Sequence, residues 1–310
     1  VYKRQDLGCD VVLAGNYGVP LISCTERYDY VILETSSYQA QDGAIVADVA
    51  VVLNLFTEHL DWHKDESQYH KDKLNLLKQA KHMVLNAKDE NTVRQVKKTT
   101  EAVTWFNQLN GFYELNQVLM YQDKALVSEY GWQLKGAHNL LNAAAVCTVV
   151  LLLGLDIKVA VNGLKKFKPL PHRLQPIGTY HGVTFIDDSI SSTPHATLAA
   201  MKTVDASKTI LLVGGFDRGV DWSWWVKEIK SQPLKLLVCS GQNGKKIHQC
   251  VLNHEIKSQS IYQANLKQAV ETAVQAATVG DVVLLSPGAP SFDAFKDYQH
   301  RGRKFEQWIK

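Results

Sequence analysis

A short polar stretch at residues 54–77, NLFTEHLDWHKDESQYHKDKLNLL, concentrates side chains that could do chemistry. Glu58, His59, Asp61 and His63 fall close together there, and carboxylate and imidazole groups can bind a metal ion or transfer a proton. A hydrolytic zinc site is poorly supported, because zinc needs three well-placed ligands and the sequence contains no HExxH motif. Metal binding, acid–base chemistry and the capping of a charged helix stay open for this stretch.

Lys73 follows in the segment QYHKDKLNLL, whose leucines predict a helix with one face in a core. Most lysines on such helices are solvated, and spacing does not distinguish Lys73 from Lys71 or Lys78. The helix by itself therefore assigns no chemistry to a particular lysine.

Two predicted apolar strands are each followed by a polar side chain at or after the strand end. YVILETSSYQ is a strand that ends in Glu34, and DVAVVLNLFTEH is a strand followed by His59. If the strands are parallel, both residues lie at the carboxyl edge of one sheet, where α/β proteins bind ligands. Glu34 then resembles a Walker-B carboxylate, which holds Mg²⁺. The alternative, that Glu34 only caps the next helix, is equally good on this motif alone.

A long apolar helix begins in GAHNLLNAAAV with Asn139 and Asn142 on one face. Amide side chains at a helix start suit nucleotide recognition. A helix cap beside an exposed asparagine explains the two residues equally well.

The last 140 residues place polar loops after three predicted strands. PHRLQ supplies Arg173, a planar cation suited to phosphate. The strand ends carry Asp187 and Asp188 in TFIDDSISSTP, Arg218 in LLVGGFDRGVDW, and Ser291 after LLSPGAP. Because carboxyl ends of parallel strands meet at one edge, the three loops together predict a ligand crevice.

Short Val-, Ile- and Leu-rich runs alternate with helical patterns, which predicts an α/β protein with parallel sheets. Strands are expected at 30–33, 49–53, 83–86, 183–186, 209–213, 235–239 and 281–285, and helices at 67–79, 137–153, 157–164, 193–203, 222–229, 265–277 and 291–308. Residues 100–135 predict a small aromatic-rich antiparallel sheet. KKFKPLPHR, with two helix-breaking prolines, predicts a boundary between domains at 1–168 and 169–310.

The bulk composition excludes several classes of protein. A net charge of +3 in 310 residues is too small to indicate a nucleic-acid or anionic-membrane partner. The five cysteines form no CxxC pair, which fits a reducing compartment. No apolar run is long enough to span a bilayer and no signal peptide is visible, so we expect a cytoplasmic protein.

Taken in order, these motifs resemble the Mur ligases, most closely their glutamate-adding, MurD-like branch. The resemblance runs through GNYG, ETSSYQ, NLFTEHLDWH, YHKDKL, GAHNLLNAAA, PHRLQ, DDSISSTP, GGFDRGVDW and SPGAPSFDAFKDYQHRG. It implies a P-loop-type central domain at 1–168 and a Rossmann-like C-terminal domain at 169–310. It also implies a monomer that phosphorylates UDP-N-acetylmuramoyl-L-alanine with ATP as co-substrate and joins the acyl phosphate to glutamate in peptidoglycan synthesis, with two Mg²⁺ ions.

The resemblance also implies roles for individual residues. Glu34 and His59 match metal ligands, and Lys73 matches a lysine that is carbamylated and helps to hold the second Mg²⁺. Further matches are Asn16, Ser36 and Gln39 at the muramoyl substrate and phosphates; Asn139 and Asn142 at adenine; Arg173 at the ATP phosphates; Asp188 at ribose; and Ser192, Arg218, Ser291, Phe292 and Tyr298 at the amino acid. Glu58, Asp61 and His63 are then left with loop and capping roles.

The chain departs from the family pattern at two places. It contains no GxxxxGKS or GxxxxGKT loop. We therefore expect a fragment that lacks its N-terminal UDP-binding domain and P-loop strand, with unpaired strand edges and no activity by itself. Ile190 stands where the family's D-glutamate enzymes carry a lysine. Arg218 must therefore supply more of the positive charge that neutralises the glutamate carboxylates. D-glutamate is the family default, and an L-glutamate branch also fits.

Two other functions stay open from the sequence. A folylpolyglutamate-type ligase shares the central and C-terminal folds, and we would expect a different set of C-terminal loops in it. A non-catalytic nucleotide-binding relative would bind without turnover.

Overall fold

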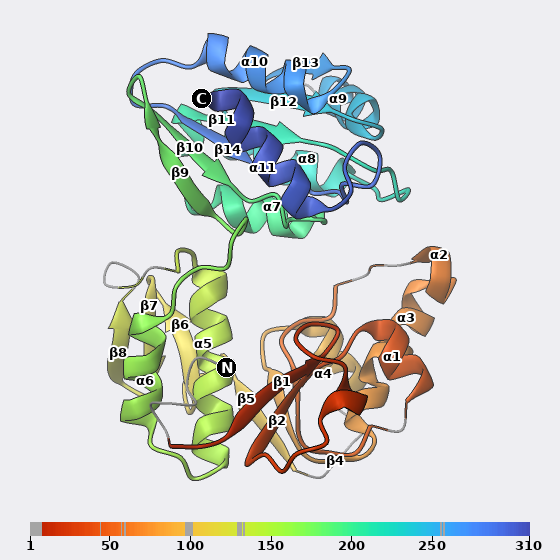
Figure 1. Ribbon diagram of the computed structural model, residues 1–310, viewed down its shortest axis with the longest axis vertical. Coiled ribbons are helices and arrows are strands. Elements are labelled where there is room, and N and C mark those ends of the chain that lie inside the picture. The colour runs from red at the N-terminus through yellow and green to blue at the C-terminus, as the bar shows by residue number, and fades with distance from the viewer. Residues whose placement is uncertain are drawn as a thin grey trace. The chain divides into compact units, whose positions relative to one another are not determined.

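The computed structural model describes residues 8–43, 45–56, 58, 60–96, 102–128, 132, 134–254, 256 and 258–310, without the side chains of residues 60 and 61. The chain divides into two compact units, Val1–Lys168 (unit 1) and Pro169–Lys310 (unit 2) (Figure 1). Pro169 and Pro171 follow the last helix of unit 1 directly. The alternation of strands and helices confirms the predicted α/β class.

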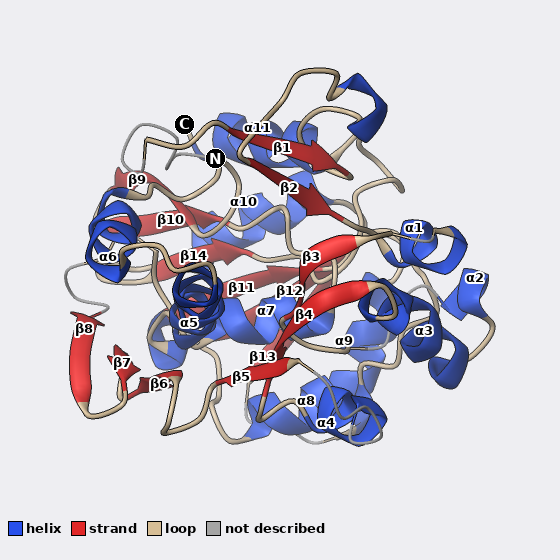
Figure 2. Ribbon diagram, turned by 90° about the horizontal axis from the view of Figure 1, so that it is seen from below, coloured by secondary structure: helices blue, strands red, loops and turns tan. Residues whose placement is uncertain are grey.

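Unit 1 contains two groups of parallel strands. β1 (Val11–Gly15) pairs with β2 (Tyr30–Glu34), and β3 (Ala47–Val52), β4 (Ala80–Asn86) and β5 (Val103–Phe106) form the other group in that order (Figure 2). Among the strands that the structure describes, β2 hydrogen bonds only to β1 and β3 only to β4. Apolar side chains are exposed on both strands, for example Val31, Ile32 and Val51.

The helices of unit 1 carry four of the predicted residues, Gln39, Lys73, Asn139 and Asn142. These helices are α1 (Ser37–Asp42), α2 (Leu60–His63), α3 (Glu66–Lys73), α4 (Glu90–Val96), α5 (Ala137–Leu152) and α6 (Ile157–Lys166), with 3₁₀ turns η1 (Leu21–Ser23) and η2 (Leu74–Leu77). The helix expected at 67–79 is therefore α-helical only to Lys73 and continues as the tighter η2 turn.

The aromatic-rich segment forms the predicted antiparallel sheet from β6 (Phe112–Leu115), β7 (Val118–Tyr121) and β8 (Lys124–Ser128). Asn116 and Gln117 connect β6 to β7, both with positive φ, which is the backbone of a tight hairpin turn. Phe112 and Leu119 of this sheet pack in one core with Leu140 of α5.

Unit 2 is built on one six-stranded sheet with the order β13-β12-β11-β14-β10-β9. The strands are β9 (Gln175–Tyr180), β10 (Val183–Asp187), β11 (Thr209–Val213), β12 (Leu236–Ser240), β13 (Gln259–Gln263) and β14 (Val282–Leu285), and only β9 is antiparallel to its neighbour. Every residue of β11 and β12 is buried. Continuous apolar strands of this kind require cover on both faces.

Helices supply that cover as two layers (Figure 1). Side chains of α7 (Pro194–Met201), α8 (Ser223–Lys230) and α9 (Gly244–Asn253) pack in one core, and those of α10 (Leu266–Ala276) and α11 (Tyr298–Ile309) pack in the other. A 3₁₀ turn, η4 (Ala206–Lys208), precedes β11. The carboxyl ends of the parallel strands and the N-termini of the following helices thus meet at one edge.

The last predicted helix begins later than expected. Residues 291–297 form a turn in which the Ser291 carbonyl accepts hydrogen bonds from the N–H groups of Ala294 and Phe295. Asp297 then caps α11 by accepting from the N–H of His300 at 2.6 Å. Ser291 and Phe292 therefore lie on a loop, and the prediction that they belong to a helix starting at Ser291 was wrong.

No helix within the described parts of the chain is both long enough and apolar enough to cross a membrane.

Candidate functional site

The ends of β1 and β2 bring Asn16 and Glu34 together. The N–H of Asn16 donates to the carbonyl of Glu34 at 2.8 Å, and its amide Nδ2 donates to Glu34 Oε1 at 3.3 Å. Gly15 permits this approach, because a Cβ at its position would collide with the Glu34 carbonyl. Glu34 is exposed, so its carboxylate stands at the carboxyl edge of the parallel pair, where the sequence predicted it.

The first turn of α1 follows Glu34 immediately. Ser36 caps it, with Ser36 Oγ accepting from the N–H of Gln39 at 3.2 Å and the Gln39 side chain accepting from the N–H of Ser36 at 2.9 Å. This reciprocal capping box fixes the chain after the strand end. Ser36 and Gln39 thus hold the backbone that positions Glu34.

A buried hydrogen-bonded network lies behind this turn. His63 Nδ1 is 2.8 Å from Asp72 Oδ2, and His63 Nε2 is 3.0 Å from Ser37 Oγ. His63, Asp72 and Ser37 are 1%, 3% and 7% exposed. The expectation that His63 has a loop or capping role was wrong, because the ring is enclosed beside the rings of Tyr38 and Tyr69 and finds two polar partners there. The network joins the start of α1 to the last turn of α3.

Lys73 follows Asp72 directly and is half-buried. Its Nζ donates to the hydroxyl of Tyr69 at 3.1 Å. Burial lowers the pKa of Lys73, although Glu58 and Asp89 oppose the shift. A lowered pKa increases the fraction of neutral, nucleophilic amine near pH 7.

His59 lies outside the described residues. Of the three predicted metal ligands, the structure therefore describes only Glu34 and Lys73. No three His, Cys, Asp or Glu side chains gather as metal ligands in the part of the chain that the structure describes.

Asn139 and Asn142 lie in the first turns of α5. Asn139 is 6% exposed, and its Nδ2 donates to the carbonyl of Lys135 at 2.8 Å. Asn142 is half-buried one turn further along the same face. Asn139 therefore stabilises the entry to α5, and Asn142 is the more accessible of the pair.

Asp188 ties three loops of unit 2 together. Its Oδ2 accepts from Ser286 Oγ at 2.7 Å and from Ser191 Oγ, and its Oδ1 accepts from the N–H of Leu174 at 3.1 Å. The residue is only 3% exposed. Burial outweighs these hydrogen bonds and raises the pKa of Asp188 to about 6. Asp188, which was predicted to lie at the ribose, therefore holds three loops of unit 2 together.

Asp187 and His172 form a second link beside it, which the sequence analysis did not assign. His172 Nδ1 is 2.6 Å from Asp187 Oδ2, and the His172 ring packs edge-on against Tyr298 at 6.1 Å between centroids. Gly302 makes this packing possible, because a Cβ there would collide with both His172 and Asp187. Burial raises the pKa of Asp187 although His172 opposes the shift.

Arg301 completes this set of buried contacts and was also missed. It is 2% exposed, and its Nε donates to Ser189 Oγ at 3.0 Å. Its Nη2 donates to the carbonyls of Ser189 at 2.8 Å and Ala289 at 2.9 Å. The closing QHRG motif was the only signal for it, and that motif cannot reveal a burial that depends on Ser189, 112 residues earlier.

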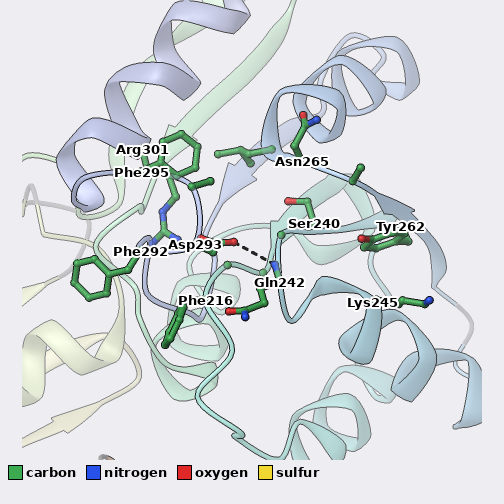
Figure 3. A pocket seen from close by; sticks show the side chains of 16 residues that line it. Phe216, Ser240, Gln242, Lys245, Tyr262, Asn265, Phe292, Asp293, Phe295 and Arg301 are labelled. Carbon is green, nitrogen blue, oxygen red and sulfur yellow. Dashed lines mark hydrogen bonds between the residues drawn. The ribbon is translucent and has the colours of Figure 1, made fainter.

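The remaining predicted residues surround this buried set. Arg173, Ser192, Arg218 and Phe292 are exposed, Tyr298 is half-buried at the start of α11, and Ser291 is buried. The charge of Arg173 lowers the pKa of Asp188 and so opposes the effect of burial. Arg218 lies on the separate loop between β11 and α8. Of the predicted residues, Phe292 lines a cavity of about 520 Å³ at the sheet's carboxyl edge (Figure 3).

Both units match known protein families in sequence. Residues 17–150 match the Mur ligase middle domain, and residues 172–288 match the Mur ligase glutamate ligase domain. Over 97% of its length the chain is 39% identical to the UDP-N-acetylmuramoyl-L-alanine--L-glutamate ligase of Xanthomonas axonopodis pv. citri, of which it covers 66%. Over 99% of its length it is 32% identical to the UDP-N-acetylmuramoylalanine--D-glutamate ligase of Francisella tularensis subsp. novicida, of which it covers 70%.

Solved structures share the fold at lower identity. MurF from Acinetobacter baumannii is 15% identical with a TM-score of 0.69, over 100% of this chain and 78% of that one. MurF from Thermotoga maritima in complex with ADP is 17% identical with a TM-score of 0.67, over 99% of this chain and 82% of that one. The chain spans 66% of the length of the Xanthomonas ligase.

The buried network of unit 1 makes a testable contribution to stability. We expect His63→Ala to lower the free energy of unfolding of unit 1 by about 2–4 kcal/mol, because the buried Asp72 Oδ2 then loses its contact with the histidine ring. Urea unfolding measures the effect. His82→Ala, at an exposed position on β4, is the matched control and should change stability by less than about 0.5 kcal/mol. Equal losses in the two variants would contradict a stabilising role for the network.

The raised pKa of Asp188 predicts a pH dependence. The folded protein takes up a proton on Asp188 near pH 6, whereas the unfolded chain does so near the ordinary value of 3.8. Folding therefore binds a proton between these values, and the stability of unit 2 falls as pH rises from about 4 to about 6 and levels off above.

Asp188→Asn should remove this part of the dependence and leave the part due to Asp187. Asp205→Asn, at an exposed carboxylate of the same unit, should leave the dependence between pH 4 and 6 intact. Urea unfolding across the pH range, with ¹³C NMR titration of the Asp188 carboxyl, measures both. A carboxyl that titrates near 3.8 would contradict the prediction.

Proposed function

The chain belongs to the Mur ligase family, and on that premise we propose that it carries the metal, ATP and amino-acid sites of an ATP-dependent ligase. Its substrates in peptidoglycan synthesis are UDP-N-acetylmuramoyl-L-alanine and glutamate. The observation that carries the proposal is 39% identity, over 97% of the chain, to a ligase named for these substrates.

In the proposed reaction, the γ-phosphoryl group of ATP moves to the alanyl carboxylate and ADP leaves. The amine of glutamate then attacks the acyl phosphate, a C–N bond forms, and phosphate leaves with loss of a proton. Charge spreads over the phosphoryl oxygens in the transition state, so cationic groups and metal ions must be fixed around them.

Glu34 and its surroundings support the metal part of the proposal. A carboxylate at the end of a parallel strand supplies the hard oxygen donors that Mg²⁺ prefers, and the Asn16 amide donates a hydrogen bond to Glu34 Oε1 at 3.3 Å. Glu34, His59 and a carbamylated Lys73 would hold two Mg²⁺ ions. When bound, Mg²⁺ neutralises phosphate charge and polarises the phosphoryl group.

The surroundings of Lys73 support its carbamylation. A neutral Nζ attacks the carbon of CO₂, an N–C bond forms, and a proton passes to solvent, so that a cation becomes an anion. Burial lowers the pKa of Lys73 and raises the supply of neutral amine. The His63–Asp72 pair fixes the helical turn from which Lys73 projects.

Arg173, Asp188 and α5 support nucleotide binding. Arg173 is an exposed guanidinium that can donate two parallel hydrogen bonds to a phosphate. Asp188 uses three of its roughly four lone-pair positions internally, which leaves one for a ribose hydroxyl. Asn139 and Asn142 would lie on the adenine side.

Ser192, Arg218, Ser291, Phe292 and Tyr298 would form the amino-acid pocket, with Arg218 as the cation for glutamate. We favour L-glutamate over the family default. The Xanthomonas relative at 39% identity is named for L-glutamate and the Francisella relative at 32% for D-glutamate, and Ile190 replaces the lysine of the D-glutamate enzymes.

Carbamylation of Lys73 can be observed directly in the 310-residue chain. With ¹³C-bicarbonate we expect one carbamate carbonyl signal in the ¹³C NMR spectrum at pH 8, and its loss in Lys73→Arg. Lys71→Arg, an exposed lysine on the same helix, should keep the signal. A signal that survives in Lys73→Arg would show that another amine carries the carbamate.

The choice of amino acid is tested by ligation with the full-length protein. We expect kcat/KM for labelled L-glutamate to exceed that for D-glutamate at least tenfold. Arg218→Gln should lower kcat/KM by about 100-fold through the loss of a charge-assisted hydrogen bond. Arg303→Gln, exposed on α11, is the control and should retain activity. Equal use of the two isomers would contradict the L-glutamate proposal, and ATP binding without turnover would favour the non-catalytic alternative.

A further inference from the structure

Lys73 is the last residue of α3, and the end of a helix is its least stable part because its carbonyl groups lack partners within the helix. The Nζ atom donates to the hydroxyl of Tyr69 at 3.1 Å. Tyr69 lies one turn earlier on the same helix, so this contact cannot by itself hold the turn in place. The position of Lys73 therefore depends on other groups that hold the last turn of α3.

Asp72 lies in that last turn, where a carboxylate is unfavourable. The C-terminal end of a helix carries partial negative charge and favours cations, yet Asp72 is 3% exposed there. Both of its oxygens have a partner. Oδ1 accepts from Gln68 Nε2 at 2.6 Å, and Oδ2 lies 2.8 Å from His63 Nδ1. These two contacts offset the cost of burying the carboxylate at this end of the helix.

The ring of His63 is also held from its other side. Its Nε2 lies 3.0 Å from Ser37 Oγ, and the rings of Tyr38 and Tyr69 lie 5.5 and 5.3 Å away between centroids. Because the carboxylate of Asp72 can only accept, Nδ1 carries the hydrogen and Nε2 accepts from the Ser37 hydroxyl. Ser37 begins α1, which packs against α3 (Figure 2). Hydrogen bonds thus run without a break from α1 to the last turn of α3.

The order Ser37, His63, Asp72 is also that of the nucleophilic triad in serine hydrolases. In such a triad the serine hydroxyl must reach the carbonyl group of a substrate. Ser37 and His63 are both buried. Burial therefore favours a role in holding the structure over a role in nucleophilic attack.

The network begins three residues after Glu34. The capping box of Ser36 and Gln39 fixes the chain between Glu34 and Ser37. Glu34 and Lys73 are the two proposed metal ligands that the structure describes. Their segments are therefore joined through the ring of His63.

We propose that His63 and Asp72 are positioning residues, which hold the last turn of α3 so that Lys73 Nζ stays in place for its reaction with CO₂. The inference rests on the proposed function, because it concerns the proposed carbamylation of Lys73. In that reaction Nζ forms an N–C bond to CO₂ and a proton passes to solvent, and neither His63 nor Asp72 takes part in the bond changes. Without them the turn can open, Nζ loses its place beside the hydroxyl of Tyr69, and the fraction of chains with a carbamate falls.

Two substitutions of His63 separate positioning from the mere loss of a ring. His63→Asn places an amide nitrogen at the position of Nδ1, from which it can still donate to Asp72. His63→Gln places the amide nitrogen at the position of Nε2, where it faces Ser37. With ¹³C-bicarbonate and the 310-residue chain, we expect the carbamate signal of His63→Asn to stay within about twofold of the unsubstituted chain, and that of His63→Gln to fall about fivefold, as the loss of one hydrogen bond predicts.

Leu119→Ala is the control for a loss of stability alone. Leu119 is buried in the core between the antiparallel sheet and α5, in which no described side chain of α1 or α3 takes part. The substitution should lower the urea midpoint of unfolding at least as far as His63→Gln does, and should leave the carbamate signal unchanged. Urea unfolding of each variant gives the midpoint and the conditions in which the variant is fully folded for the NMR measurement.

Ser37→Ala keeps the test decisive if a His63 variant does not fold. It removes one hydroxyl from the far side of the ring and should lower the carbamate signal at least about twofold.

Three results would overturn the positioning role and leave the proposed function intact. These are a full carbamate signal in His63→Gln or in Ser37→Ala, an equal loss in His63→Asn and His63→Gln, and an equal loss in Leu119→Ala. Absence of the carbamate from the unsubstituted chain would instead contradict the carbamylation of Lys73, and this inference with it.

Discussion

The buried carboxylate of Asp188 is the interaction on which unit 2 depends. Three connections end near it: the segment before β9, the turn after β10 and the turn after β14, each of which donates one hydrogen bond. Without that acceptor the donors would lie buried and unpaired, which costs more than the loss of exposed bonds. Burial also raises the pKa of the carboxyl, so the geometry of the loops is coupled to a proton. Exposed residues such as Arg173 and Ser192 take their places from this anchor.

Much of the fold could be predicted, because it follows from short-range patterns. The buried run TILLV at β11 and the long helix from Ala137 can be recognised from the pattern of apolar residues in the sequence. Two of the elements that were missed, β9 and β13, lack such a pattern. β13 reads QSIYQ and β9 contains Pro176 and Gly178, and both are edge strands whose pairing depends on neighbours far along the chain. α11 begins only after the cap at Asp297, although the apolar pattern favoured a helix from Ser291 onward.

The positions of some candidate residues could be predicted because a strand end carries them. Glu34 lies at the end of a strand of unit 1, and Asp188 and Ser291 follow strands of unit 2. Within each unit, parallel topology brings such strand ends to one edge. His63, Asp72 and Arg301 could not be found in this way. Their roles arise from burial between segments that are distant in sequence, as in the contact of Arg301 with Ser189 across 112 positions. From the sequence alone, a charged residue at such a position is predicted to lie on the surface, because its buried partners are not known.

Arg301 shows how a buried cation can hold several loops at once. Its Nε and Nη2 are held by Ser189 and Ala289, and these bonds fix the plane of the guanidinium. The third nitrogen, Nη1, is buried beside the backbone of Gly215, where a Cβ would lie 3.0 Å from it. The guanidinium therefore depends on this glycine as well as on its hydrogen-bond partners, because a larger residue at position 215 would press against a group that cannot move without breaking its hydrogen bonds.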